Sequence, residues 1–269
     1  MSLGSVITYL PYLLSAIVRP SSSDLSGTSV RHHYEDGTVT CFAFKNDLDL
    51  LWEVEAGPAA GATGRESYFA TSPREGLYLV DYVAATERAT TVSHVLDLAR
   101  GAATVVVGTL PAEADVQKSA FRLALEGSDL PAVGARFLRA AIDRPFAPDS
   151  HGHAPTSELV GKRVRYVYGP TETYEHIYLN ENLYTWQCLA GREKGLADTD
   201  RCHYWRIADQ LYLFVWRERV VPTLGLVLVD WRTMRSSGKI FGYESSDFGT
   251  LSNTPVASAA TLLNVTSLV

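Results

Sequence analysis

Hydrophobic and polar residues alternate along most of this chain in short runs. Between positions 159 and 244 the runs are rich in aromatic and β-branched residues, and Gly, Pro, Asn or Asp separates them. This pattern is typical of successive antiparallel strands, because alternate side chains of a strand point to opposite faces of its sheet. It predicts strands at 162–168, 174–179, 183–189, 202–208, 210–217, 224–231 and 237–243.

A similar pattern occurs 134 residues upstream, in the same register and without a gap. The matched pairs include Trp52 with Trp186, Asn46 with Asn180 and Tyr78 with Tyr212. The chain is therefore a tandem duplication of one mostly-β unit, with a period far longer than that of a solenoid repeat. In the first copy the predicted strands are 28–34, 39–45, 49–55, 66–71, 76–83, 91–98 and 102–108.

Seven or eight short strands in hairpin order favour a closed up-and-down barrel for each copy. Closure leaves no unpaired strand edge, and the lumen of such a barrel can hold one small ligand. We therefore predict a mainly β fold, with two tandem lipocalin-like antiparallel barrels at 25–110 and 158–245.

The segments outside the predicted barrels differ in composition. Residues 111–157 read as a linker with helical composition at 112–126 and 132–143, followed by a loop rich in Pro, Gly and His. The last residues, 246–269, are rich in Ser, Thr and Ala and read as a tail, with a possible short helix at 257–268. The linker would connect one barrel to the next.

The first 24 residues contain an apolar run at 6–18, which Pro11 interrupts. The run is too short to span a bilayer, and neither Lys nor Arg precedes it as in a signal peptide. We expect an arm that packs on the body of the protein and no membrane span.

Charge and cysteine content narrow the possible partners. Lys and Arg number 24 against 30 Asp and Glu, a net charge of −6, which disfavours nucleic-acid binding. The three cysteines, Cys41, Cys188 and Cys202, are an odd number and indicate a reducing, cytoplasmic compartment. The pair Cys202-His203 lacks the ligand spacing of a metal site, so we predict buried free thiols and no bound metal. We also predict that the protein needs no cofactor. A homodimer is possible.

Three runs of the second copy carry a family resemblance: 176–181 (HIYLNE), 195–204 (GLADTDRCHY) and 238–244 (GKIFGYE). They resemble the C-terminal unit of the MoaF family, and the first copy, 25–110, is similar to that family's more variable N-terminal unit. The resemblance covers most of the chain. It implies the tandem barrel fold and establishes no reaction.

The second copy also resembles the lipocalin-like phenolic acid decarboxylases. The similar residues are Tyr166 and Tyr168 on the first strand and Glu218 just after Trp216. The resemblance implies that the two tyrosines grip a substrate carboxylate and that the glutamate handles a phenolic proton. The arginine of those enzymes has no match here, since Arg192 and Arg201 flank its expected place; this departure puts decarboxylation itself in doubt.

The alternation of side chains along a strand supports a role for the same residues without the family resemblance. Phe214, Trp216 and Glu218 share one face of a predicted strand, so Glu218 either points into an apolar lumen or makes a salt bridge at the rim with Arg217 or Arg219. Burial in the lumen would raise the pKa of its carboxyl and suit it to acid–base chemistry. The candidate catalytic residues are Glu218, His176, Tyr166 and Tyr168. The candidate ligand contacts are Tyr178, Tyr174, Trp186, Trp216, Phe214, Arg192, Arg201 and His203.

At the offset of 134, Ala84 stands where the second copy has Glu218, and Phe42 stands where it has His176. The first barrel should therefore keep a bulky core and lack the titratable groups. We expect the second barrel to act on a small aromatic or amine-derived metabolite, as a cofactor-independent lyase, isomerase or cyclase. The alternative is a carrier that binds such a molecule without chemistry.

Overall fold

The computed structural model describes residues 19–20, 22–127, 131–150, 152–244 and 248–267. Residues 1–18 of the predicted arm at 1–24 lie outside them. The chain has two compact units. One unit contains Arg19–Thr109 and Ala135–His153, and the other contains Leu110–Gly134 and Ala154–Val269. Each unit holds one barrel, and the two are described separately below.

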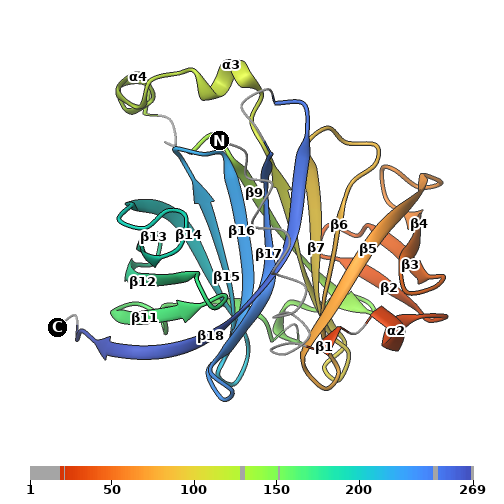
Figure 1. Ribbon diagram of the computed structural model, residues 1–269. Coiled ribbons are helices and arrows are strands. Elements are labelled where there is room, and N and C mark those ends of the chain that lie inside the picture. The colour runs from red at the N-terminus through yellow and green to blue at the C-terminus, as the bar shows by residue number, and fades with distance from the viewer. Residues whose placement is uncertain (1–18, 21, 128–130, 151, 245–247, 268–269) are drawn as a thin grey trace. The chain divides into compact units, whose positions relative to one another are not determined.

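The first barrel is built from β2 to β9, each strand hydrogen-bonded to the next along the chain (Figure 1). Pairing of β5 with β6 and of β2 with β9 closes the sheet, so every strand of the eight has two neighbours. The elements of this unit are β1 (Arg19–Pro20), α2 (Ser22–Leu25), β2 (Ser29–Tyr34), β3 (Val39–Phe44), β4 (Asp49–Ala56), β5 (Thr63–Arg74), β6 (Leu77–Val83), β7 (Thr90–Asp97), β8 (Ala102–Thr109), β9 (Gly134–Ile142) and η2 (Pro148–Ser150).

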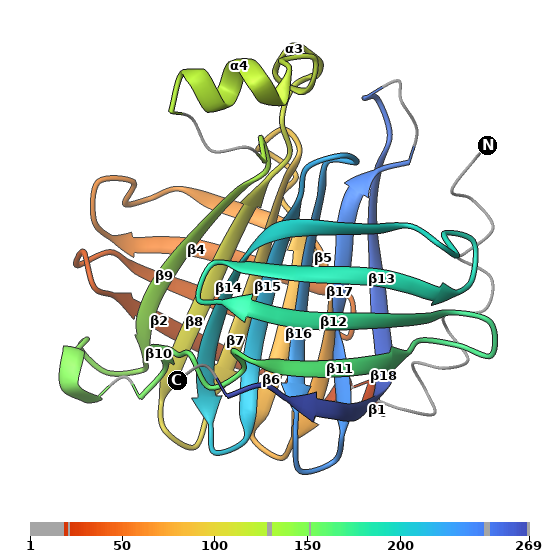
Figure 2. The same cartoon turned by 90° about the vertical axis from the view of Figure 1, so that its left-hand side faces the viewer.

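The second barrel has the same order of strands and closes through the pairs β14–β15 and β11–β18. Figure 2 shows β13, β12, β11 and β18 side by side on one wall. Its elements are α3 (Glu113–Val116), α4 (Ala120–Leu125), β10 (Ala154–Pro155), β11 (Lys162–Val167), β12 (Thr173–Asn180), β13 (Leu183–Ala190), β14 (Ala197–Ala208), β15 (Leu211–Glu218), β16 (Thr223–Asp230), β17 (Arg235–Tyr243) and β18 (Leu251–Val265). The prediction of two tandem antiparallel barrels is confirmed.

The helix predicted at 132–143 is wrong, because these residues form β9. Alanines give the segment its helical composition, but intrinsic propensity is weak beside strand pairing. His32 pairs with Ile142 in the closing seam, and Ala140 and Ile142 are buried in the barrel core. The eighth strand of the first barrel therefore comes from the segment that the sequence suggested was a linker.

The tail or helix predicted at 246–269 is likewise a strand over most of its length, namely β18. β18 pairs with β11 on one side and β17 on the other, with Tyr166 opposite Ala260. The helix predicted at 112–126 is present as two short helices, α3 and α4. Ser119 caps α4 by accepting a hydrogen bond from the Arg122 amide at 3.2 Å.

Alternation along the strands sorts the side chains of the second barrel. Residues of even number on β15 enter a buried aromatic cluster, as parity predicts. Trp216 lies opposite Gly225 of β16, and a Cβ at Gly225 would overlap the indole ring. A glycine there is thus what allows β15 to carry a tryptophan into the barrel.

Candidate active site

Aromatic side chains from β11 to β15 fill the interior of the second barrel. The hydroxyl oxygens of Tyr166 and Tyr178 lie 2.6 Å apart, and the ring of His176 lies 4.7 Å from that of Tyr166. Phe214 and Trp216 stack with ring centroids 5.2 Å apart. The structure therefore brings these five predicted residues together, and Tyr168 and Trp186 pack against the same cluster.

Burial fixes the protonation state of the innermost groups. It lowers the pKa of His176 to about 3 and raises the pKa of the Tyr166 hydroxyl above its usual value. In the described structure the Nδ1 atom of His176 has no hydrogen-bond partner. A charged form is costly in such surroundings, so both side chains remain neutral at physiological pH.

Glu218 occupies the last position of β15, at the end of the barrel that we call the mouth. Its side chain is partly buried, and Oε1 accepts a hydrogen bond from Trp216 Nε1 at 2.8 Å. Burial, followed by the negative charges of Asp200, Glu193 and Asp198, raises the pKa of this carboxyl to about 8, although the indole bond acts in the opposite direction.

The sequence left open whether Glu218 faces the lumen or a rim salt bridge. Its contact in the structure is the Trp216 indole inside the barrel, whereas Arg217 Nη1 donates to the carbonyl oxygen of Val133 at 3.3 Å. The Glu218 carboxyl therefore lies on the inner side of the strand, at the edge of the aromatic cluster.

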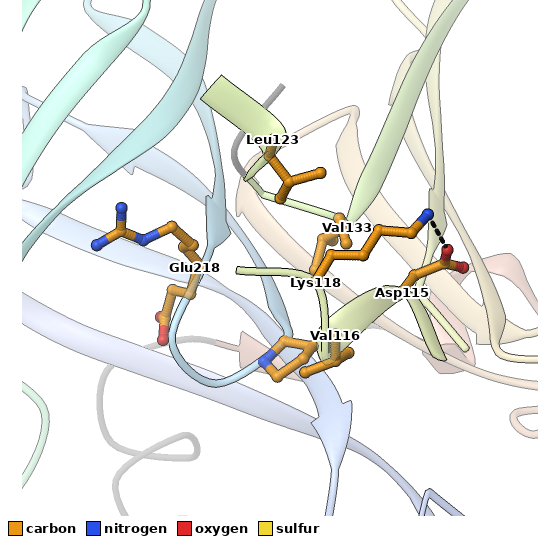
Figure 3. A pocket seen from close by; sticks show the side chains of 9 residues that line it. Asp115, Val116, Lys118, Leu123, Val133 and Glu218 are labelled. Carbon is orange, nitrogen blue, oxygen red and sulfur yellow. Dashed lines mark hydrogen bonds and ion pairs between the residues drawn. The ribbon is translucent and has the colours of Figure 1, made fainter. Parts of the chain in front are cut away.

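A small cavity of about 40 Å³ lies next to Glu218 (Figure 3). One part of its lining comes from Asp115, Val116, Lys118, Leu123, Ala132 and Val133. Lys118 Nζ lies 3.0 Å from Asp115 Oδ1. The other lining residues are Glu218, Arg219 and Pro222. This volume holds one or two water molecules.

Asp200 is a second carboxyl at the mouth and a residue whose role the sequence reasoning missed. It lies within β14 and is 3% exposed. Oδ2 accepts a hydrogen bond from Trp186 Nε1 at 2.9 Å, and Oδ1 accepts one from the Arg219 amide at 3.2 Å. Burial raises the pKa of this carboxyl as well. Its parity with the buried Cys202 and Tyr204 is the signal that could have identified it.

Four of the predicted ligand contacts lie at the edge of the site or outside it. The Tyr174 hydroxyl donates to Glu193 Oε2 at 2.9 Å, near the mouth. Arg192 lies in the turn between β13 and β14. Arg201 and His203 alternate with the inward residues of β14 and therefore lie on its outer face. They are not among the residues that the fold brings to Glu218.

The first barrel is more polar inside than the sequence comparison suggested. His32 and His94 are buried there, and burial lowers the pKa of both. Glu66 is 3% exposed and accepts hydrogen bonds from Trp52 Nε1 at 3.2 Å and from the Ala85 amide at 2.9 Å. Ala84 and Phe42 lack the titratable groups of Glu218 and His176, but the first barrel buries titratable side chains at other positions. The space around His32 and His94 leaves no room for a water molecule.

No helix among the described residues is both long and apolar enough to cross a membrane. Within the same residues, no three His, Cys, Asp or Glu side chains gather in a way that could hold a metal ion. The cysteines are free thiols: Cys188 and Cys202 are buried and Cys41 is partly buried.

Two closed eight-stranded antiparallel barrels in tandem define a protein of the lipocalin-like β-barrel class. Family models give the class a name: the MoaF N-terminal domain matches residues 14–112, and the MoaF C-terminal domain matches residues 153–266. Protein MoaF of Klebsiella aerogenes is 47% identical over 208 residues, covering 75% of this chain and 76% of that protein. The chain belongs to the MoaF family.

Among solved structures, a putative beta-lactamase from Burkholderia vietnamiensis matches 44% of this chain and 92% of its own, at 20% identity. Its TM-score of 0.32 is too low to support any inference about this protein.

Proposed function

We propose that the second barrel is a cofactor-independent acid–base enzyme, of lyase or isomerase type, and that Glu218 is its proton-transferring group. The observation that carries the proposal is the position of this carboxyl. It lies beside a cavity, its pKa is about 8, and it accepts a hydrogen bond from the Trp216 indole. Perturbed carboxyls in a cleft are common among catalytic groups.

The pKa indicates which way the proton moves first. At pH 7 a carboxyl of pKa about 8 is roughly nine-tenths protonated, so Glu218 would first act as a general acid. The proton it gives to a substrate would leave a carboxylate that the Trp216 N–H stabilises. That carboxylate would then recover a proton from the product or from water, which completes an acid–base cycle without a cofactor.

The surroundings of Glu218 favour a small substrate with an aromatic ring. Trp216 belongs to the aromatic cluster that Glu218 borders, and the partly buried Tyr168 and Trp186 pack against the same cluster. Aromatic rings pack well against one another, so an aromatic substrate would suit these surroundings. The cavity of about 40 Å³ is far below the size of an ordinary small-molecule pocket, about 300–1,000 Å³. Binding therefore requires lining residues such as Lys118, Leu123 and Val133 to move away from Glu218. Free thiols support a reducing, cytoplasmic setting.

The test joins ligand discovery to a pH profile. The purified protein is incubated with fractionated metabolites, and mass spectrometry identifies compounds that are bound or converted. For a converted compound, kcat/KM should fall as the pH rises through about 8 in the unaltered protein. Glu218→Gln should lower kcat by about 100-fold or more, which is the usual contribution of a positioned acid or base.

The packed interior favours one second candidate, a non-catalytic binding protein. Tyr166 and Tyr178 satisfy each other's hydroxyls, and His176 is held neutral, so these interior groups serve packing. Under this alternative, a bound compound would be recovered unchanged, and Glu218→Gln would alter its affinity without any turnover to lose.

A further inference from the structure

Both barrels contain the same three-part contact, which we call the indole–carboxylate bridge. In the second barrel, Asp200 accepts hydrogen bonds from the Trp186 indole and the Arg219 amide. In the first barrel, Glu66 accepts them from the Trp52 indole and the Ala85 amide. Each residue of one bridge lies 134 positions from its counterpart in the other.

The bridge joins parts of the barrel that are distant along the chain. Trp186 lies on β13, Asp200 on the neighbouring β14, and Arg219 directly after β15. A carboxylate that accepts two N–H groups while 3% exposed leaves neither oxygen free to move. The bridge therefore fixes the backbone of Arg219, the residue that follows Glu218 at the end of β15.

We propose that Asp200 is a positioning residue for Glu218: by holding the Trp186 indole and the Arg219 amide together, it keeps the Glu218 carboxyl at the mouth cavity and bonded to Trp216. The inference rests on the proposed function of Glu218 and deepens it. In the first barrel the matching bridge stands beside Ala84, so there it has no carboxyl to position.

Other groups also act on Glu218, and the test must separate Asp200 from them. The charged and titratable groups near the mouth come from three elements and from the segments between elements. They are Asp198 and Asp200 of β14, Tyr184 of β13, Asp115 of α3, Lys118 after α3, Glu193 before β14, Arg219 after β15 and Tyr168 after β11. A variant that keeps every one of these charges and removes the indole donor separates positioning from charge.

Trp186→Phe is that variant, and Trp52→Phe is its matched control in the first barrel. The measurement is the titration of the Glu218 carboxyl, followed by ¹³C NMR of protein labelled at glutamate Cδ and assigned with Glu218→Gln. If Asp200 positions Glu218, Trp186→Phe lets water reach the carboxyl, and its pKa falls by about one unit or more. Trp52→Phe should leave that titration unchanged. An equal titration in both variants would overturn the proposal.

Asp200 itself gives a second comparison should Trp186→Phe fail to fold. Asp200→Asn also removes a negative charge that raises the pKa of Glu218, so it is compared with Asp198→Asn, which removes a neighbouring negative charge and leaves the bridge in place. Asp200→Asn should lower the pKa of Glu218 by more than Asp198→Asn does. Asp200→Glu should restore it, because Glu66 shows that a glutamate can make both contacts. Glu66→Gln is the control. If Asp200→Asn destabilises the chain as Glu66→Gln does but leaves the Glu218 titration in place, the bridge is structural only.

These titrations need no substrate, so their outcome is separate from that of the proposed function. Full turnover by Glu218→Gln would refute the role of Glu218 and would leave the positioning result unaffected. Where turnover is available, Trp186→Phe should shift the upper limb of the kcat/KM profile to lower pH, and Trp52→Phe should not.

Discussion

The raised pKa of Glu218 should make the second barrel less stable as the pH increases. The pKa is about 8 in the folded protein and about 4.5 for an ordinary glutamate, so the folded state binds more protons between these values. Stability is then highest below pH 4.5 and falls as the pH rises toward 8. Glu218→Gln removes the titrating group and with it this dependence.

The magnitude follows from the linkage relation. Each pH unit between the unfolded pKa of 4.5 and pH 7 lowers the free energy of unfolding by about 1.36 kcal/mol. The ionisation of Glu218 therefore costs about 3.4 kcal/mol of stability at pH 7 relative to low pH. Solvent reaches the carboxyl at the mouth and weakens the effect, so we expect Glu218→Gln to stabilise the second barrel by roughly 2–3 kcal/mol at pH 7. Near pH 4.5 the two proteins should differ little.

Hydrogen exchange of β15 and β16 at several pH values reports the free energy of unfolding of the second barrel by itself. Glu181→Gln, at an exposed turn, controls for the loss of one negative charge. A difference between Glu218→Gln and the unaltered protein that stays constant from pH 5 to pH 8 would refute the reasoning.

Two further predictions concern the residues around Glu218. Burial lowers the pKa of His176 from 6.5 to about 3, so its contribution to the free energy of unfolding is complete above pH 6.5 and is lost as the pH falls toward 3. His176→Phe, which copies Phe42, removes this dependence. Between pH 7 and pH 5 the unaltered protein should therefore lose about 2 kcal/mol more of its free energy of unfolding than His176→Phe does, as measured by denaturation at the two pH values. Gly225→Ala should push the Trp216 indole aside and destabilise the second barrel by about 1–3 kcal/mol, as seen by denaturation. Loss of the indole hydrogen bond should raise the pKa of Glu218, because that bond stabilises the carboxylate; an unchanged pKa in carboxyl NMR would contradict the indole contact.

The alternation of hydrophobic and polar residues was sufficient to place most strands, because alternate side chains of a half-buried strand face the core and the solvent. It failed where the repeat changes its spacing. Tyr166 follows His32 by 134 residues, but their partners in the closing strands, Ala260 and Ile142, are separated by 118. The alanine-rich segment 132–143 has no match at the offset of 134. Its composition was therefore the only signal, and that composition favoured a helix.

The candidate site shows the same division between local and non-local information. Parity within one strand placed Glu218 and Trp216 on the same face, and the structure joins them by a hydrogen bond. Asp200 depends on Trp186, 14 residues away, and on the Arg219 amide, 19 residues away. Backbone donors carry no sequence signal, so a carboxylate that accepts from one is invisible until the register of β13, β14 and β15 is known.

The duplication indicates what distinguishes the working barrel. The indole–carboxylate bridge is present in both barrels, so the bridge by itself does not distinguish them. The differences lie on the neighbouring strands, where the second barrel replaces the pair Tyr82 and Val92 with Trp216 and Gly225. These changes depend on each other, because the larger indole fits only opposite a residue without a Cβ.

The indole in turn supplies the N–H that Glu218 accepts, where the first barrel has Ala84 with no acceptor side chain. A carboxyl placed at Ala84 alone would therefore lack its donor, and a tryptophan at Tyr82 alone would collide with Val92. Gly225, Trp216 and Glu218 depend on one another: the glycine leaves space for the indole, and the indole N–H donates to the carboxyl. That interdependence is the physical reason to place acid–base chemistry in the second barrel and to read the buried histidines of the first as core.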